Sequence, residues 1–134
     1  MEIEVGEYVR TKNGVIAKVE NIETYYADKV YWFDKVIYRD YEDGIEHLYD
    51  YKLEEYILKR SKNIIELIEE GDFVNGKQIE CILETSIKVK DVAERILCFE
   101  TDFPIEKGLR TYHNCDIKSI VTKEQFKNIE YRLE

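Results

Sequence analysis

The sequence contains one proline, two histidines and three cysteines, and it has no long apolar run. No uninterrupted apolar stretch approaches the roughly 20 residues that span a bilayer. At the start, Glu2 and Glu4 follow Met1, where a signal peptide would have basic residues and then an apolar segment. These absences predict a cytoplasmic protein with no membrane partner.

The low number of histidines leaves few candidates for a catalytic base. A side-chain nucleophile needs a base and an orienting partner, and only His47 and His113 are available. No glycine-rich phosphate loop, HExxH motif or GxSxG motif is present. Acidic pairs such as Glu42-Asp43 and Glu69-Glu70 carry the oxygen ligands that divalent cations prefer, but solvated turns explain these pairs more simply. We therefore expect no enzymatic activity, no cofactor and no metal.

The cysteines are Cys81, Cys98 and Cys115, each 17 positions from the next. An odd count without a close pair argues against a disulfide framework, and zinc ligands are normally spaced more closely. His113 is near Cys115, but further ligands would have to come from elsewhere in the fold. Cys81 and Cys98 lie within apolar stretches, so we expect them to be small buried hydrophobic residues.

Basic residues are outnumbered by acidic ones, and the net charge is −9. Residues 1–67 carry 10 basic and 15 acidic side chains, and residues 68–134 carry 10 and 14. Nucleic-acid binding depends on Lys and Arg that neutralise phosphates, so this charge disfavours direct nucleic-acid binding. It favours a partner protein with a basic surface, because complementary charge raises the association rate. The alternative is that the carboxylates only keep the protein soluble.

A repeated motif divides the sequence into two halves. Residues 5–9 (VGEYV) and 70–74 (EGDFV) share a glycine, an acidic residue, an aromatic residue and a valine, and an Asn-Gly pair follows each of them. Gly6 and Gly71 are 65 positions apart. Periodicity on this scale predicts duplicated supersecondary units.

The later parts of the two halves also correspond. Ile16 and Ile79, which begin the next alternating stretches, are 63 positions apart, and Ile57-Leu58 matches Ile120-Val121 at the same spacing. Small loop deletions would explain why this spacing is shorter than that of the glycines.

Period-two alternation predicts strands over most of the chain. Strands are expected at residues 15–22, 30–33, 36–39, 77–83, 86–89, 95–100 and 109–113. Asp43-Gly44 predicts a hairpin turn between residues 36–41 and 45–51. The single proline, Pro104, indicates a loop over residues 102–108.

A helical turn and a closing strand are expected at the end of each half. Thr122 and Gln125 have the spacing of a capping box, and Ser61 would be the corresponding cap in the first half. The closing strands would then be residues 66–69 and 128–133.

These elements predict the fold class. We expect a mainly β protein of two tandem SH3-like small β-barrels, residues 1–67 and 68–134, each closed by a short helical turn and a final strand. The glycine of each opening strand would mark the bend that a small barrel needs.

Two segments carry a resemblance. Residues 61–76 (SKNIIELIEEGDFVNG) and 116–131 (DIKSIVTKEQFKNIEY) resemble a group of short, mostly uncharacterised proteins of phages and prophages of low-GC Gram-positive bacteria. Proteins of that group also open with a glycine, an acidic residue, an aromatic residue and a valine. The resemblance implies a mobile genetic element, where small accessory proteins often counter host defences. It implies no catalytic residues.

Aromatic residues are concentrated in the first half, where ten of the 17 lie between Tyr25 and Tyr56. Only alternate residues of a strand face a core, so Tyr31 and Phe33 on one face leave Trp32 on the other. The rings either build the first core and its edges or form a protein-binding patch. For a patch, the candidate binding residues are Tyr25, Tyr26, Tyr31, Trp32, Tyr38, Tyr41, Glu42 and Asp43.

The preferred hypothesis is a non-enzymatic, phage-type accessory protein that binds a host protein and inhibits a nucleic-acid-binding defence factor, as an anti-CRISPR or another anti-defence protein. One alternative is a sponge for a nucleotide second messenger, which would stack the base on tyrosine and hold phosphate with Lys59, Arg60 and Lys62. Another is a small-barrel nucleic-acid-binding protein, which the net charge disfavours.

Overall fold

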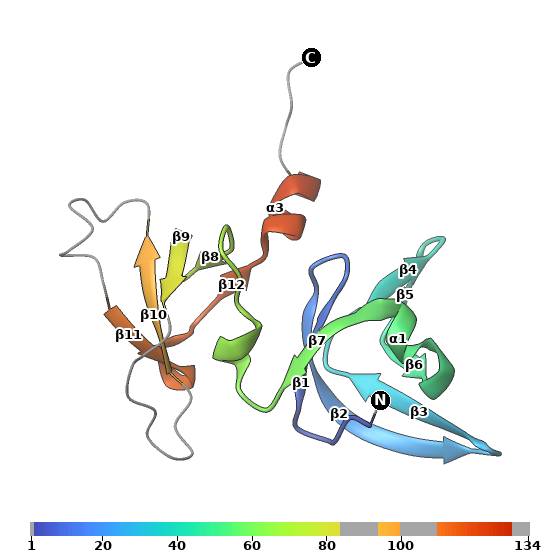
Figure 1. Ribbon diagram of the computed structural model, residues 1–134. Coiled ribbons are helices and arrows are strands. Elements are labelled where there is room, and N and C mark those ends of the chain that lie inside the picture. Colours follow the sequence, from blue (N-terminus) through green and yellow to red (C-terminus); the bar gives the residue numbers. More distant parts are fainter. Residues whose placement is uncertain (1, 84–93, 100–109, 130–134) are drawn as a thin grey trace. The chain divides into compact units, whose positions relative to one another are not determined.

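A computed structural model describes residues 2–83, 94–99 and 110–129 (Figure 1). The strand expected at residues 86–89 and the loop expected at 102–108 lie outside these ranges. The chain divides into two compact units, Met1–Lys62 and Asn63–Glu134.

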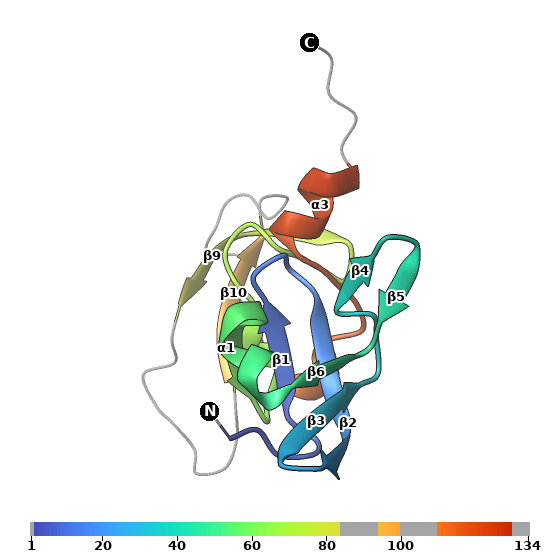
Figure 2. The same ribbon diagram turned by 90° about the vertical axis from the view of Figure 1, so that its right-hand side faces the viewer.

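The first unit contains a five-stranded antiparallel sheet with strand order β6-β3-β2-β1-β7. Its strands are β1 (Tyr8–Thr11), β2 (Ile16–Tyr25), β3 (Asp28–Phe33), β6 (His47–Tyr49) and β7 (Ile57–Ser61). The remaining elements are the hairpin strands β4 (Tyr38–Asp40) and β5 (Asp43–Ile45), the 3₁₀ helix η1 (Asp50–Lys52) and the one-turn helix α1 (Leu53–Tyr56). Figure 2 shows the β4–β5 hairpin beside the sheet.

The core of the first unit is formed by alternate residues of these strands, as period-two patterning requires. It consists of Ile3, Val9, Ala17, Val19, Tyr31, Phe33, Ile37, Leu48, Leu53 and Ile57. In β3, the core therefore takes Tyr31 and Phe33 and leaves Trp32 on the opposite face.

The second unit has a five-stranded antiparallel sheet of order β11-β10-β9-β8-β12. Its strands are β8 (Phe73–Val74), β9 (Lys77–Leu83), β10 (Glu94–Phe99), β11 (Arg110–His113) and β12 (Ile120–Val121). Its helical elements are η2 (Ile64–Leu67), η3 (Asn114–Asp116) and α3 (Lys123–Ile129). Its core consists of Ile65, Ile68, Val74, Ile79, Leu97 and Phe99.

The two sheets have the same connectivity. In each unit the opening strand lies between the second strand and the last strand, and a helical turn precedes the last strand. Within the described residues, no ladder joins the edge strands β6 and β7, or β11 and β12. The architecture is therefore mainly β, with open antiparallel sheets and no closed barrel.

The repeated motif forms the same turn in both units. Gly6 has φ +95° and Gly71 has φ +94°, a region that favours glycine. The N–H of Glu4 donates to the carboxylate of Glu7 at 2.6 Å, and the N–H of Glu69 donates to that of Asp72 at 2.7 Å. The acidic residue of the motif thus accepts a backbone hydrogen bond inside the turn, and this contact explains why glycine and an acid recur together.

Replacing Gly6 by alanine tests the strain at this turn. A Cβ at Gly6 would meet no atom within 4 Å, so the cost is conformational. We expect the free energy of unfolding to fall by about 1–2 kcal/mol, measured by chemical denaturation. Val5→Ala, at an exposed position of the same turn, is the matched control and should have little effect. Equal stability of the two variants would contradict the argument.

The correspondence between the units differs from the one expected from sequence. Gly6 N–H bonds to Val19 O at 2.9 Å and Gly71 N–H bonds to Ile79 O at 2.9 Å, so Val19, and not Ile16, corresponds to Ile79. Beyond the opening turn the spacing is therefore 60 positions. The β8–β9 hairpin is shorter because Asn75 and Gly76, at φ +52° and +83°, make a two-residue turn.

The same spacing holds at the ends of the units. Ile57 and Ile117 both follow a helical turn and donate back into it, so Ile57 corresponds to Ile117 and not to Ile120. Tyr8 pairs with Ser61 as Phe73 pairs with Val121. The expected match of Ser61 with Thr122 is therefore displaced by one residue.

The closing strand expected at residues 66–69 is wrong, because residues 64–67 form η2, whose Ile65 and Leu67 are buried. Of the closing strand expected at residues 128–133, Asn128 lies in α3, and residues 130–133 lie outside the described ranges. Among the described residues the last strands of the two units are β7 and β12, and the first unit ends at Lys62 rather than at residue 67. Ile65, which the expected boundary places in the first half, belongs to the core of the second unit.

The two expected helix caps have different outcomes. The capping box at α3 is confirmed, because Thr122 N–H donates to Gln125 Oε1 at 3.1 Å and Gln125 N–H donates to Thr122 Oγ1 at 3.3 Å. Ser61 is not a cap, since it lies in β7 and η2 begins after Asn63 without a side-chain cap.

The hairpin turn expected at Asp43-Gly44 lies two residues earlier. Asp40 pairs with Asp43 and Arg39 with Gly44, so that Tyr41 and Glu42 form the turn. A Cβ at Gly44 would lie 2.8 Å from a methyl of Val36. Glycine is required there for close packing and not for the turn.

Candidate functional site

The face of the first unit's sheet that points away from the core carries the candidate site. The pairing of β2 with β3 and of β3 with β6 places directly opposite residues on the same face. We call the part of this face formed by residues 21–25 of β2, by β3 and by β6 the outer face, and it consists of Asn21, Glu23, Tyr25, Asp28, Val30, Trp32, His47 and Tyr49.

A continuous row of rings runs along the outer face. The ring of Trp32 lies 4.8 Å from that of His47, and the His47 ring lies 5.9 Å from that of Tyr49. Tyr49 stacks on Tyr51 of η1 at 5.4 Å with 13° between the ring planes. We call these four residues the aromatic row. Trp32 is 37% exposed and Tyr51 is 65% exposed, so the row presents ring surface to solvent.

Val30 shows that the outer face is packed. It is buried although it lies between Glu23 and Tyr49 on this face and does not belong to the core cluster. Its neighbours must therefore shield it. Val30 therefore supports the packing of the face, and the exposed rings around it are the part that a partner could contact.

The charge of the outer face is negative. Glu23 and Asp28 are its charged residues, and none of its eight positions is Lys or Arg. Lys18, which lies between the core residues Ala17 and Val19 in β2, projects to the same side of the sheet beside Tyr8.

The residues predicted from the sequence to bind a partner lie in different parts of the first unit. Tyr25 and Trp32 lie on the outer face, and the exposed Tyr26 contacts Tyr25 edge to face at 4.6 Å. Tyr31 is only 2% exposed and belongs to the core. It offers little surface to a protein partner, because alternation along β3 turns it away from Trp32.

The other proposed residues lie at the β4–β5 hairpin. Tyr41, Glu42 and Asp43 are at or beside its turn, and Tyr41 is 97% exposed. Tyr38 stacks on Tyr56 at 4.8 Å. Burial, followed by the charge of Tyr56, raises the pKa of Tyr38 above its ordinary value. Among the described residues, no ring contact connects these tyrosines to the aromatic row.

The binding residues predicted from the sequence did not include His47, Tyr49 and Tyr51. The signal was present, since three rings at alternate positions are expected on one face of an extended segment. What the sequence did not show is that β6 pairs with β3, which places His47 opposite Trp32.

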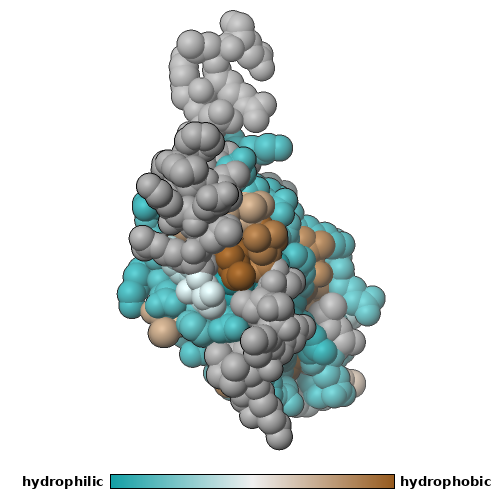
Figure 3. Space-filling model, turned by 60° about the vertical axis from the view of Figure 1, so that its left-hand side comes forward, coloured by the Kyte–Doolittle hydropathy of each residue, from teal (hydrophilic) through white to brown (hydrophobic). Residues whose placement is uncertain are grey.

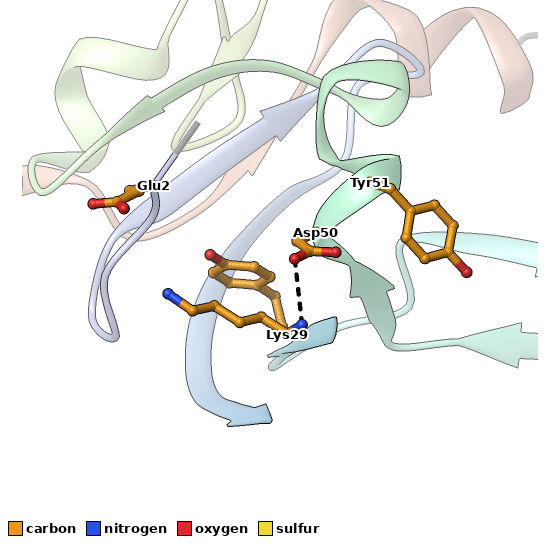
Figure 4. A pocket seen from close by; sticks show the side chains of 5 residues that line it. Glu2, Lys29, Asp50 and Tyr51 are labelled. Atoms are coloured by element: carbon orange, nitrogen blue, oxygen red, sulfur yellow. Dashed lines mark hydrogen bonds between the residues drawn. The ribbon is translucent and has the colours of Figure 1, made fainter. Parts of the chain in front are cut away.

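A pocket of about 420 Å³ lies near one end of the row. It is open to solvent and is lined by Glu2, Lys29, Tyr31, Asp50 and Tyr51 (Figure 4). The backbone N–H of Lys29 donates to Asp50 Oδ2 at 3.3 Å. Because the lining combines two carboxylates with an ammonium group, the pocket does not select strongly for a ligand of either charge.

Two of the three basic residues expected to hold phosphate, Lys59, Arg60 and Lys62, form ion pairs with carboxylates. Arg60 pairs with Glu7 at 3.7 Å and Lys62 pairs with Glu4 at 3.1 Å. Lys59 belongs to the same strand as Arg60. A phosphate at this position would compete with these carboxylates.

The described part of the chain contains no cluster of side chains that could bind a metal ion. His113 Nε2 lies 2.9 Å from Glu94 Oε2, and its Nδ1 lies 3.6 Å from Asp116 Oδ2. Nevertheless, no group of three or more His, Cys, Asp or Glu side chains among residues 2–83, 94–99 and 110–129 could hold a metal ion. Cys98 is buried, Cys81 is partly exposed and Cys115 is exposed.

Among the described residues of the second unit, three large apolar side chains are exposed. They are Leu83, Val121 and Phe126. Figure 3 shows a local group of apolar side chains at a surface that is otherwise mostly hydrophilic. Within the described ranges, no helix has the length and the apolar composition needed to cross a membrane.

Comparison of the chain with protein-family models, with curated proteins and with solved structures found no match.

Proposed function

We propose that this chain is a non-enzymatic binding protein and that the outer face of its first unit binds a basic surface of a partner protein. The observation that carries the proposal is the aromatic row, a series of contacting and partly exposed rings beside the carboxylates Glu23 and Asp28, with no Lys or Arg among the eight positions of the outer face.

The chemistry of the face supports a protein partner. Tyrosine and tryptophan supply large, rigid contact areas and are enriched among the residues that dominate binding energy. Lys and Arg side chains of a partner are attracted to the faces of aromatic rings. Glu23 and Asp28 would complement their charge and speed association.

The same proposal extends to the fold of each unit, the biological setting and the partner. We regard the two units as duplicated, SH3-like modules; the shared connectivity of their sheets supports the duplication, although no ladder among the described residues closes either sheet into a barrel. The resemblance to phage and prophage proteins supports an accessory role in a bacterial host cell. A nucleic-acid-binding defence factor is the proposed partner, because such proteins must present basic surfaces to bind phosphates.

The proposal is tested by affinity capture with the full chain. Wild type, Trp32→Ala and Tyr41→Ala are immobilised and exposed to lysate of a low-GC Gram-positive host, and retained proteins are identified by mass spectrometry. Tyr41 is the matched control because it is highly exposed but lies outside the outer face. We expect wild type and Tyr41→Ala to retain the same basic protein, with release as salt is raised.

The affinity of that protein for Trp32→Ala should fall by about 30-fold, as expected for an interface anchor worth about 2 kcal/mol. Equal binding by Trp32→Ala and wild type would place the site elsewhere. Retention of a nucleotide or an oligonucleotide instead of a basic protein would favour one of the two alternatives.

A further inference from the structure

Two cysteines that are distant in sequence are neighbours in the second unit. Cys81 of β9 and Cys98 of β10 are directly opposite each other in the antiparallel ladder. Directly opposite residues of such a ladder have Cα atoms about 4.5 Å or 5.5 Å apart, depending on the type of pair. Disulfides join Cα atoms about 4.4–6.8 Å apart. Either type of pair therefore meets this requirement.

The direction of the side chains also fits. The next pair, Leu97 with Ile82, packs in or against the core of the second unit. Successive residues of a strand point to opposite faces, so Cys81 and Cys98 both project to the other face. Two thiols on one face at directly opposite positions are placed to react with each other.

The two thiols differ in solvent exposure, and this difference determines which of them reacts first. Cys98 is fully buried, whereas Cys81 is partly exposed. A reagent from solution therefore meets Cys81 first. Cys115 is exposed but lies in η3, and it is not part of this pair.

We propose that Cys81 and Cys98 form a reversible cross-strand disulfide when the protein reacts with a small-molecule disulfide. The Cys81 thiolate attacks one sulfur of the reagent, and the displaced small thiolate takes up a proton. Cys98 then loses its proton and attacks Cys81 Sγ, which releases the second small thiol. Two protein thiols are oxidised to one disulfide, and the reagent is reduced to two thiols.

The test uses the full chain carrying Cys115→Ser, so that the exposed third thiol does not react. The protein is treated with oxidised glutathione, and its intact mass is measured without reductant. We expect a mass lower by two hydrogen atoms, restored by dithiothreitol, and a proteolytic fragment in which the two cysteines are linked.

Two variants in the same background identify the steps. Cys98→Ala should accumulate one glutathione adduct on Cys81, because the second attack is lost. Cys81→Ser should not react. The result on the Cys115→Ser protein does not depend on the folding of either variant. A lasting glutathione adduct on its Cys81, or no reaction of the folded protein under conditions that oxidise the denatured chain, would overturn the proposal.

Discussion

Replacing Asp72 by alanine is expected to lower the free energy of unfolding by about 3 kcal/mol, because two backbone hydrogen bonds to a buried carboxylate are lost. Asp72 is fully buried. Its Oδ2 accepts the N–H of Glu69 at 2.7 Å, and its Oδ1 accepts the N–H of Lys123 at 3.0 Å. One side chain thereby joins the opening turn of the second unit to the start of α3.

Asp72→Asn is the control for this prediction. Its single carbonyl oxygen replaces one of the two acceptors, so chemical denaturation should show a loss of stability smaller than that of Asp72→Ala. Lys123→Gln removes the 3.0 Å ion pair with Glu69 but keeps the backbone N–H at residue 123. This partly buried pair, with Glu69 19% exposed and Lys123 43% exposed, should contribute about 1 kcal/mol. If Asp72→Ala cost no more than Lys123→Gln, the role of the buried carboxylate would be refuted.

Replacing Tyr31 by alanine is expected to lower the free energy of unfolding by about 3–5 kcal/mol, whereas Trp32→Ala should cost about 1–2 kcal/mol, because 37% of Trp32 is exposed. The two residues are neighbours in β3, but Tyr31 fills the core and Trp32 lies on the outer face. Thermal and chemical unfolding would measure both losses. Trp32→Ala should therefore remain folded while losing its partner.

Tyr31→Phe separates ring burial from the hydroxyl, and it should keep most of the stability, because the ring supplies the buried apolar area. A Trp32→Ala loss as large as that of Tyr31→Ala would mean that Trp32 supports the fold. The binding result for Trp32→Ala would then not identify an interface.

The features that were predicted correctly from the sequence are those that depend on neighbouring residues in the chain. Alternation located most strands, and the bounds of β9 agree with the expected residues 77–83. The spacing of Thr122 and Gln125 predicted the capping box that the structure contains. The repeat around Gly6 and Gly71 predicted equivalent openings, and both glycines have a positive φ.

Features that depend on packing between distant segments were not predictable in this way. The apolar pattern after Lys62 does not show which core Ile65 enters. Asp43-Gly44 has the composition of a turn, but Tyr41 and Glu42 form it, and Gly44 lies in β5 where a Cβ would be 2.8 Å from a methyl of Val36.

The candidate site shows the same limit. Alternation predicted that Tyr31 and Trp32 face opposite sides, but it did not establish which side is the core. It also did not show that β6 lies beside β3 and extends the rings from Trp32 to Tyr51. Both facts depend on strand pairing.

The most direct measurement uses the fluorescence of Trp32, the single tryptophan of the chain. Within this chain its emission reports on the outer face alone, so acrylamide quenching can be compared with and without the captured basic protein once the partner's own emission is subtracted. We expect the partner to shield Trp32 from acrylamide at low salt and to lose this effect at high salt. Unchanged quenching under conditions in which the complex is intact would contradict binding through the outer face.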